Sequence, residues 1–234
     1  MPVEIKICGL NSQDGLDAAL AAGADWVGLV FFPASPRHVD LAQAAALAAR
    51  ARGKAGVVAL TVDMDDDALA ALCAAVQPDM LQVHGAETPE RVAGIRAAFG
   101  RPVMKALGIA GPADIARARH YAAVADRLLL DAKPPAGASR PGGNGAAFDW
   151  SLIAGLDLPK PFMLSGGLTP DTVAQALART GAPGVDVSSG VESAPGLKDP
   201  DRIAAFVRAA RLAGVVARPP ASAGAPAHET SIVP

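Results

Sequence analysis

The sequence predicts a single-domain α/β fold, a closed parallel (β/α)8 or TIM barrel. Eight short apolar runs rich in Val, Leu and Ile recur along the chain, and Ala-rich segments of helical length separate most of them. The 234 residues are 51% hydrophobic, which suits one domain of barrel size with a substantial core. The alternative is an open doubly wound sheet, but no Gly-x-Gly-x-x-Gly motif follows the first apolar run.

The strands and helices follow one another in a regular order. We expect strands at residues 4–8, 26–31, 57–62, 79–83, 102–106, 127–131, 161–165 and 184–188. The helical segments include residues 40–52, 65–76, 89–99, 171–179 and 200–212. Thr88-Pro89 and Thr169-Pro170 mark helix starts, because each places a capping hydroxyl before a first-turn proline. A strand and then a helix, repeated eight times, predict the closed barrel.

Two segments interrupt this pattern. Residues 132–147 are rich in Pro and Gly, and a loop of this length inside a compact domain is typical of a lid or a binding loop. Residues 214–234 are rich in Pro, Ala and Ser and have no apolar periodicity, so we expect a disordered tail after a barrel formed by residues 1–213.

Composition and charge exclude several kinds of partner. The formal net charge is -2 and no basic run is interleaved with aromatic residues, so no nucleic acid is expected. No stretch approaches the roughly 18 apolar residues that would span a membrane, and no leader is recognisable, so we expect a cytoplasmic protein. Cys8 and Cys73 form no Cys-x-x-Cys pair and no zinc-ligand spacing, so both are expected to be free thiols.

Strand alternation predicts which side chains face the barrel interior. Because the helix-facing side of each strand is the apolar one, Lys6 and Cys8 are expected to point inward. The same alternation turns further side chains inward on later strands: Gln82, His84, Val103, Lys105, Leu129, Asp131, Asp186 and Ser188. The first and eighth strands are neighbours in a closed barrel, so Lys6 and Asp186 are expected to form a buried ion pair.

The carboxyl ends of the strands carry the candidate chemistry. Cys8 and Asp131 each end a strand, where barrel enzymes place reactive groups, and they suggest a base and an acid. Glycine-rich and serine-rich loops follow the seventh and eighth strands, at residues 165–170 and 188–192. Loops at these two positions form the recurrent phosphate site of such barrels, although tight turns are the alternative. A third glycine cluster, at residues 142–145, is expected to close over the same group.

Two further side chains are candidates for substrate contacts. Arg37 follows a loop stiffened by Pro33 and Pro36, where its guanidinium would hold a carboxylate by paired hydrogen bonds or remain solvated. His84 closes the fourth strand, where it would contact a substrate or cap the strand end. No second ligand stands at metal-binding spacing from His84, so no metal is expected.

Taken together, seven motifs resemble the phosphoribosylanthranilate isomerase family, in order, over roughly residues 3–211. These motifs are Lys6-Ile7-Cys8-Gly9, Ser35-Pro36-Arg37, Leu81-Gln82-Val83-His84-Gly85, Leu128-Leu129-Leu130-Asp131, Gly142-Gly143-Asn144-Gly145 before Phe148-Asp149-Trp150, Gly166-Gly167-Leu168 and Gly184-Val185-Asp186-Val187-Ser188-Ser189-Gly190-Val191-Glu192. Ser165 departs from the alanine more often expected there, and the tail has no counterpart.

The resemblance implies a cofactor-free barrel enzyme of tryptophan biosynthesis, an aldose-ketose isomerase. Its reaction is the Amadori rearrangement of N-(5-phosphoribosyl)anthranilate to 1-(2-carboxyphenylamino)-1-deoxyribulose 5-phosphate. By the same resemblance, Cys8 is the general base, Asp131 is the general acid, and Arg37 contacts the anthranilate moiety. The expected substrate-binding residues are Arg37, His84, Gly143, Gly145, Gly166, Gly167, Asp186, Ser188, Ser189 and Gly190. A small phosphoribosyl substrate is the expected partner, bound by a monomer or a homodimer.

The proposed acid and base would ordinarily be in the wrong protonation states. Unperturbed pKa values of about 8.5 for Cys and 3.9 for Asp leave a thiol and a carboxylate at neutral pH. We hypothesise that Lys6, about 6–7 Å from Cys8 along the strand, favours the thiolate. Burial and the substrate's anionic groups would favour protonated Asp131.

Two other functions stay open. Another phosphosugar barrel enzyme of amino-acid biosynthesis is possible, although Cys8 argues against the two-carboxylate isomerase of histidine biosynthesis. Lys105 leaves room for indoleglycerol-phosphate synthase, which uses catalytic lysines. A barrel that only binds a phosphorylated ligand is the second alternative, and the joint presence of Cys8 and Asp131 argues against it.

Overall fold

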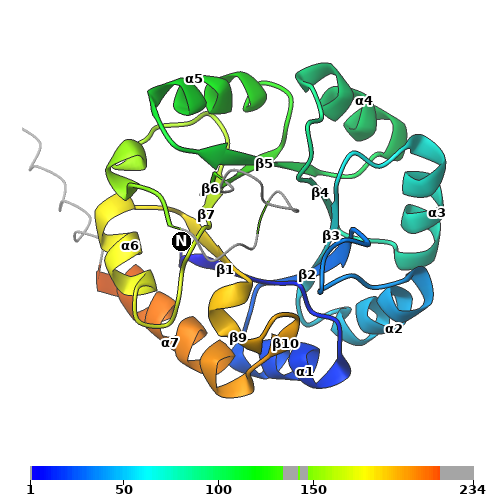
Figure 1. Ribbon diagram of the computed structural model, residues 1–234, viewed down its shortest axis with the longest axis horizontal. Coiled ribbons are helices and arrows are strands. Elements are labelled where there is room, and N and C mark those ends of the chain that lie inside the picture. The colour runs from blue at the N-terminus through cyan, green and yellow to red at the C-terminus, as the bar shows by residue number, and fades with distance from the viewer. Residues whose placement is uncertain (1, 134–141, 143–146, 217–234) are drawn as a thin grey trace, which may run out of the picture.

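Eight parallel strands close into a barrel in chain order, and helices surround it (Figure 1). The computed structural model describes residues 2–133, 142 and 147–216. Its barrel strands are β1 Glu4–Cys8, β2 Trp26–Phe31, β3 Gly56–Thr61, β4 Met80–Val83, β5 Val103–Ile109, β6 Arg127–Ala132, β7 Phe162–Leu164 and β8 Gly184–Val187. Pairing of β1 with β8 closes the ring, which confirms the TIM barrel and excludes the open sheet.

Among the described residues, a helix follows each barrel strand except β6. The helices are α1 Gln13–Ala22, α2 Leu41–Ala51, α3 Asp66–Val76, α4 Pro89–Phe99, α5 Pro112–Tyr121, α6 Val173–Thr180 and α7 Pro200–Val216. Two 3-10 helices, η1 Trp150–Ile153 and η2 Ser189–Val191, and a hairpin of β9 Glu192–Ala194 and β10 Leu197–Lys198 complete the described elements. Among these helices, none is long and apolar enough to span a membrane.

The expected eighth helix is absent from the described residues between β6 and β7. Only η1 stands there, and the Asp149 carboxylate caps it by accepting from the Ser151 amide at 2.9 Å. The preceding segment is rich in Pro and Gly, which are the weakest helix formers. Most of the expected 132–147 loop, and residues 217–234 of the expected tail, lie outside the described residues. The last helix α7 continues to Val216, so it takes in the first residues assigned to the tail.

Helix starts follow the capping signals in most places. The Thr88 hydroxyl accepts from the Arg91 amide at 3.2 Å and begins α4, as predicted. The start predicted at Thr169-Pro170 is wrong, because α6 begins at Val173. The Thr169 amide instead donates to the Thr172 hydroxyl at 2.9 Å, and this bond closes a turn before the helix.

The core forms two shells, and strand alternation sorts most side chains between them. Outside the sheet, apolar side chains of strands and helices pack together; inside it lies a smaller cluster of Val58, Met80, Met104, Ala106, Leu129 and Met163. The inward placement of Lys6, Cys8 and Asp186 is as predicted, and all three are buried.

The prediction for β5 is wrong. Met104 and Ala106 face the interior, so Val103 and Lys105 face the helices. Both faces of β5 are buried, so alternation gave no contrast to read. Lys105 is tolerated outside because its ammonium donates to Glu87 at 2.7 Å and to the Gly85 carbonyl at 2.8 Å. Lys105, which kept the synthase alternative open, therefore lies on the helix-facing side of the sheet and outside the barrel interior.

Candidate active site

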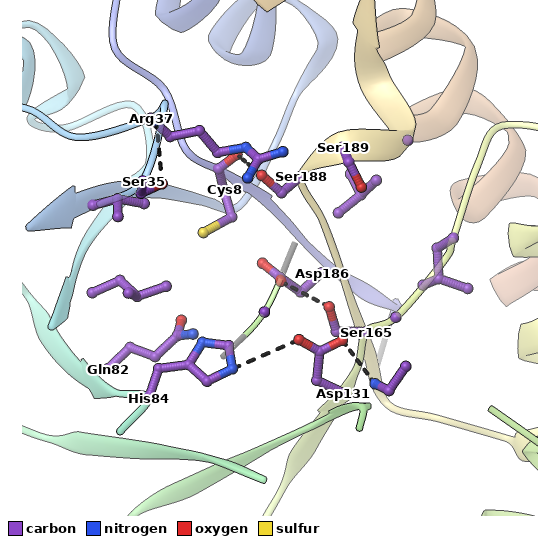
Figure 2. A pocket seen from close by; sticks show the side chains of 18 of the residues that line it. Cys8, Ser35, Arg37, Gln82, His84, Asp131, Ser165, Asp186, Ser188 and Ser189 are labelled. Atoms are coloured by element: carbon purple, nitrogen blue, oxygen red, sulfur yellow. Dashed lines mark hydrogen bonds and ion pairs between the residues drawn. The ribbon is translucent and has the colours of Figure 1, made fainter. Parts of the chain in front are cut away.

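One pocket at the carboxyl ends of the strands gathers the predicted site residues (Figure 2). The empty space in it, together with open solvent at its mouth, is about 790 Å³. The predicted residues that line it are Cys8, Arg37, His84, Asp131, Gly166, Gly167, Asp186, Ser188, Ser189 and Gly190. Gly142 also lines it, whereas Gly143 and Gly145 lie outside the described residues.

Cys8 lies at the end of β1 with the ammonium of Lys6 below it. A Cβ on Gly28 of β2 would stand 2.9 Å from the Cys8 Sγ and 3.1 Å from the Lys6 Nζ, so this glycine leaves the space where the two groups converge. Burial raises the pKa of the Cys8 thiol above its usual range, although Lys6 and then Lys198 lower it. The expected effect of Lys6 has the right direction, but burial outweighs it and leaves a thiol in the free protein.

The predicted ion pair between Lys6 and Asp186 is confirmed. The Lys6 Nζ lies 2.7 Å from the Asp186 Oδ1, and both side chains are buried inside the barrel. Burial acts to lower the pKa of Lys6, but Asp186 outweighs it and raises the value to about 12. The Ser165 hydroxyl donates to the other Asp186 oxygen at 3.1 Å. The serine that departs from the family pattern thus helps to hold a buried carboxylate.

Asp131 lies near the end of β6 on its inward face, in surroundings that favour the protonated carboxyl. Burial, and then the nearby negative charge of Asp186, raise the pKa of Asp131 to about 7. The Ala132 amide donates to its Oδ1 at 2.8 Å and fixes the carboxyl orientation. The protonated form of Asp131 is therefore populated at neutral pH, unlike that of an ordinary aspartate. This agrees with the hypothesis that burial favours the acid form.

His84 lies beside Asp131 as a neutral imidazole. Its Nε2 is 3.7 Å from the Asp131 Oδ2. Burial, and then the charge of Lys105, lower the pKa of His84 to about 4. At neutral pH the ring can donate one hydrogen bond to Asp131 or to a bound ligand. Gln82, which was expected only to face inward, also lines the pocket, and its buried Oε1 has no hydrogen-bond partner among the described residues.

The loops after β7 and β8 meet at one side of the pocket. A Cβ on Gly190 would stand 1.8 Å from the Leu168 carbonyl oxygen, so only glycine permits this approach of the two loops. Gly166 and Gly167 both have positive φ, at +88° and +64°. The Ser188 hydroxyl donates to the Cys8 carbonyl at 3.1 Å and so ties the β8 loop to the end of β1.

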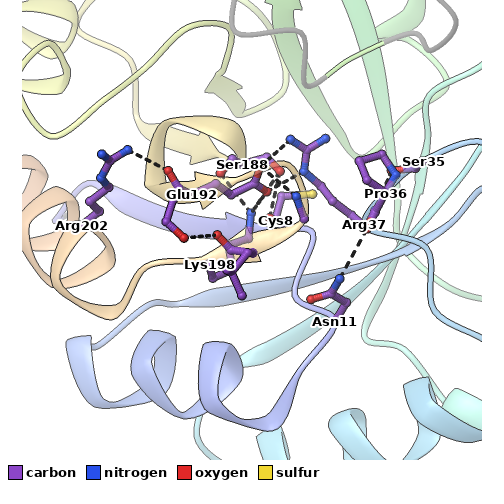
Figure 3. A network of polar contacts seen from close by, with 12 residues as sticks. Cys8, Asn11, Ser35, Pro36, Arg37, Ser188, Glu192, Lys198 and Arg202 are labelled. Atoms are coloured by element: carbon purple, nitrogen blue, oxygen red, sulfur yellow. Dashed lines mark hydrogen bonds and ion pairs between the residues drawn. The ribbon is translucent and has the colours of Figure 1, made fainter.

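Arg37 is buried, and a carboxylate of the protein already holds one edge of it (Figure 3). Its Nε and Nη2 donate to the two oxygens of Glu192 at 2.6 and 2.8 Å. Lys198 donates to the same carboxylate at 2.7 Å. Burial opposes ionisation of Glu192, but Arg37 and Lys198 outweigh it and keep the pKa of Glu192 below its usual range. The motif around Glu192 was noted without a role, and nothing in the sequence near Lys198 signals its part.

Comparisons with known proteins show the family to which this chain is similar. Residues 5–209 match the family described as N-(5'phosphoribosyl)anthranilate (PRA) isomerase. The chain is 64% identical over 211 residues to the N-(5'-phosphoribosyl)anthranilate isomerase of Rhodopseudomonas palustris strain BisA53, covering 90% of this chain and 97% of the relative. It is 60% identical over 219 residues to the enzyme of that name from Azorhizobium caulinodans, covering 94% of this chain and 96% of the relative.

Solved structures of that family have the same fold. The phosphoribosyl anthranilate isomerase of Thermotoga maritima superposes with a TM-score of 0.80 at 34% identity, covering 89% of this chain and 98% of that one. A phosphoribosyl anthranilate isomerase in complex with reduced 1-(o-carboxyphenylamino)-1-deoxyribulose 5-phosphate gives a TM-score of 0.76 at 33% identity, with the same coverage of both chains. The chain belongs to the N-(5'-phosphoribosyl)anthranilate isomerase family.

Proposed function

We propose that this protein isomerises N-(5'-phosphoribosyl)anthranilate, with Cys8 as general base and Asp131 as general acid. One observation carries the assignment of roles: a carboxyl whose pKa is about 7 and a thiol flanked by an ammonium line the same pocket (Figure 2). Proton transfer by positioned groups is efficient when the pKa of the acid lies near the working pH. The overall change is an aldose-ketose isomerisation within one molecule.

Each step assigns one proton to a named group. Asp131 gives its proton to the furanose oxygen as the bond from that oxygen to C1 breaks, and the nitrogen lone pair forms the C1=N bond of an iminium ion. The Cys8 thiolate removes the C2 proton, and the electron pair of that bond forms the enolamine. Return of the thiol proton to C1 and transfer of the O2 proton to Asp131 give the ketose. Both groups are then restored, so atoms and charge balance.

The rest of the pocket supports one orientation of the substrate. Backbone amides of Gly166, Gly167, Ser189 and Gly190 are offered to the phosphate, at the usual phosphate position of such barrels. Arg37 faces the same pocket and receives the anthranilate carboxylate.

The remaining residues proposed to contact the substrate are assigned either because they line the same pocket or from the sequence alone. His84, Asp186 and Ser188 line the space between the two anchored ends of the substrate, and Asp186 also acts on Asp131 through its charge. The contacts assigned to Gly143 and Gly145 stay predictions from the sequence.

We also propose a cytoplasmic location and a monomer or homodimer. The two free cysteines, one of them the proposed base, suit a reducing compartment and support this location. A Thermotoga maritima relative is described as a dimeric enzyme from which monomers were generated. Sedimentation of the purified protein at several concentrations distinguishes the two states.

The test is direct conversion of the substrate. Purified protein is added to freshly prepared phosphoribosylanthranilate, and loss of its fluorescence is followed. An unchanged molecular mass excludes hydrolysis, and the carbonyl reactivity of the product identifies the ketose. Rapid loss of fluorescence that scales with protein concentration is expected. Binding of the reduced product without any turnover would instead support a non-catalytic phosphate-binding barrel.

A further inference from the structure

Three buried charges form a cluster at the edge of the pocket, and they do not cancel. Arg37, Glu192 and Lys198 are each 6% exposed or less. Glu192 is the partner of both cations in the ion pairs of the described residues, so two positive charges share one negative charge. Burying a charge without a counter-ion costs several kcal/mol. The cluster therefore has a net charge of one positive.

Glu192 occupies a particular edge of the Arg37 guanidinium. It accepts from Nε and Nη2, which form the side edge of the planar group. The end edge, formed by Nη1 and the second proton of Nη2, has no hydrogen-bond acceptor among the described residues. Since Arg37 lines the pocket, this edge is free for a ligand carboxylate with paired hydrogen bonds.

Lys198 fixes Glu192 and connects the cluster to the rest of the site (Figure 3). Its ammonium donates to the Glu192 carboxylate at 2.7 Å and to the Ser188 carbonyl at 3.0 Å. Arg202 donates to the Glu192 carbonyl at 2.7 Å, so the backbone behind the carboxylate is also held. The guanidinium of Arg37 is thus oriented by a chain of contacts that reaches the loop following β8.

We propose that Glu192 and Lys198 are positioning residues for this reaction. They orient the free edge of the Arg37 guanidinium, and the cluster of the three residues keeps a net charge of one positive until the substrate's carboxylate binds. The inference rests on the proposed function, which supplies a substrate with an aromatic carboxylate. In this proposal Glu192 holds the Arg37 guanidinium, which binds the substrate, and Glu192 itself does not contact the substrate. A purely structural clamp between β8 and the β9–β10 hairpin is the competing explanation.

The test measures discrimination between two ligands. One is reduced 1-(o-carboxyphenylamino)-1-deoxyribulose 5-phosphate, and the other is the same compound without the ring carboxyl group. Dissociation constants of both are measured by calorimetry for the wild type, Glu192→Gln and Lys198→Met. In Glu192→Gln we expect the carboxylated ligand to bind at least about tenfold more weakly, while binding of the other ligand changes by no more than about twofold. Lys198→Met is expected to reduce the preference in the same direction.

Charge and orientation predict opposite results, which makes the outcome decisive. Glu192→Gln raises the charge of the cluster to two, so charge alone would tighten binding of the carboxylated ligand. Tighter binding, or equal weakening for both ligands, would overturn the proposal. The Glu192→Gln/Lys198→Met double variant restores one positive charge without the holding carboxylate, and its preference is expected to stay low. A wild-type preference retained by the double variant would likewise overturn the proposal.

A matched control separates these effects from general loosening. Glu87→Gln breaks an equally buried ion pair, with Lys105 at 2.7 Å, on the outer face of the barrel. It is expected to lower the melting temperature and leave the ligand preference unchanged. If Glu192→Gln does not fold, Lys198→Met decides alone, and an unchanged preference in it refutes the inference. Failure of the proposed function is distinct, because the wild type would then not turn over the substrate, whether or not it binds the reduced product.

Discussion

Changing the pH should reveal that the free protein rarely holds both reactive groups in their working forms. The pKa of Asp131 is about 7, and burial raises the pKa of Cys8 above the ordinary value for a cysteine. An ordinary cysteine already titrates well above the pKa of Asp131 and burial raises the pKa of Cys8 further, so thiolate and protonated acid coexist in only a small minority of molecules at any pH. We therefore expect kcat/KM to rise up to about pH 7, stay level over a range above it and then fall once Cys8 is ionised. The lower break is expected at the pKa of Asp131 and the upper break at that of Cys8, while the rise comes from thiolate formation and the fall from loss of the Asp131 proton.

The assay combines kinetics with a direct titration. Initial rates at low substrate give kcat/KM across the pH range, and ultraviolet absorbance of the thiolate reports Cys8. The titration uses a Cys73→Ala background, with Cys8→Ser as the blank, because Cys73 is the other free thiol of the chain. Thiolate formation complete below pH 7, or a rate that falls from pH 7 without a level region, would refute this reasoning. The limbs describe the coupled pair, so both experiments must agree before either limb is assigned.

Three further results are expected. Asp186→Asn should lower the free energy of unfolding in urea by about 3–5 kcal/mol, because Lys6 stays buried without its partner. Lys105→Met should cost a similar amount yet keep the turnover of folded molecules, whereas lost turnover would contradict its place outside the barrel. The pKa of His84 is about 4 in the folded protein, so His84 contributes free energy of unfolding above pH 6.5 and this contribution is lost as the pH falls. The pKa of Asp131 is about 7, so its contribution is present at low pH and is lost as the pH rises. In Asp131→Asn the His84 effect is no longer opposed by Asp131, so unfolding free energy should fall by roughly 3 kcal/mol or more between pH 6.5 and 4; a pH-independent stability would contradict this.

The barrel was predictable from the sequence because each strand has a local signal, a short apolar run. The bounds of the first two strands agree with the predictions, at Glu4–Cys8 and Trp26–Phe31, since each is a short apolar run that follows a turn signal. Alternation placed Lys6 and Asp186 on the inner face because polar side chains interrupt apolar strands there. It failed at Lys105, where both faces of β5 are buried and the satisfying carboxylate comes from a loop.

The electrostatics of the site was only partly predictable. Burial at the end of β6 was enough to foresee the raised pKa of Asp131. For Cys8 the sequence showed the nearby lysine but not the degree of burial, so the net direction of its pKa came out opposite to the hypothesis. The partner of Arg37 lies 155 residues away at Glu192, and only the closed ring brings the two together.

The central claim is that Cys8 and Asp131 carry the proton transfers of the reaction. Single-turnover rates of fluorescence loss in Cys8→Ala and Asp131→Asn test it most directly, with binding of the reduced product measured on the same preparations. Removal of a general acid or base costs about 10²–10⁴-fold. We predict a loss of at least about a hundredfold in each variant with binding retained within a few-fold. Either variant turning over within about tenfold of the wild-type rate would contradict the claim.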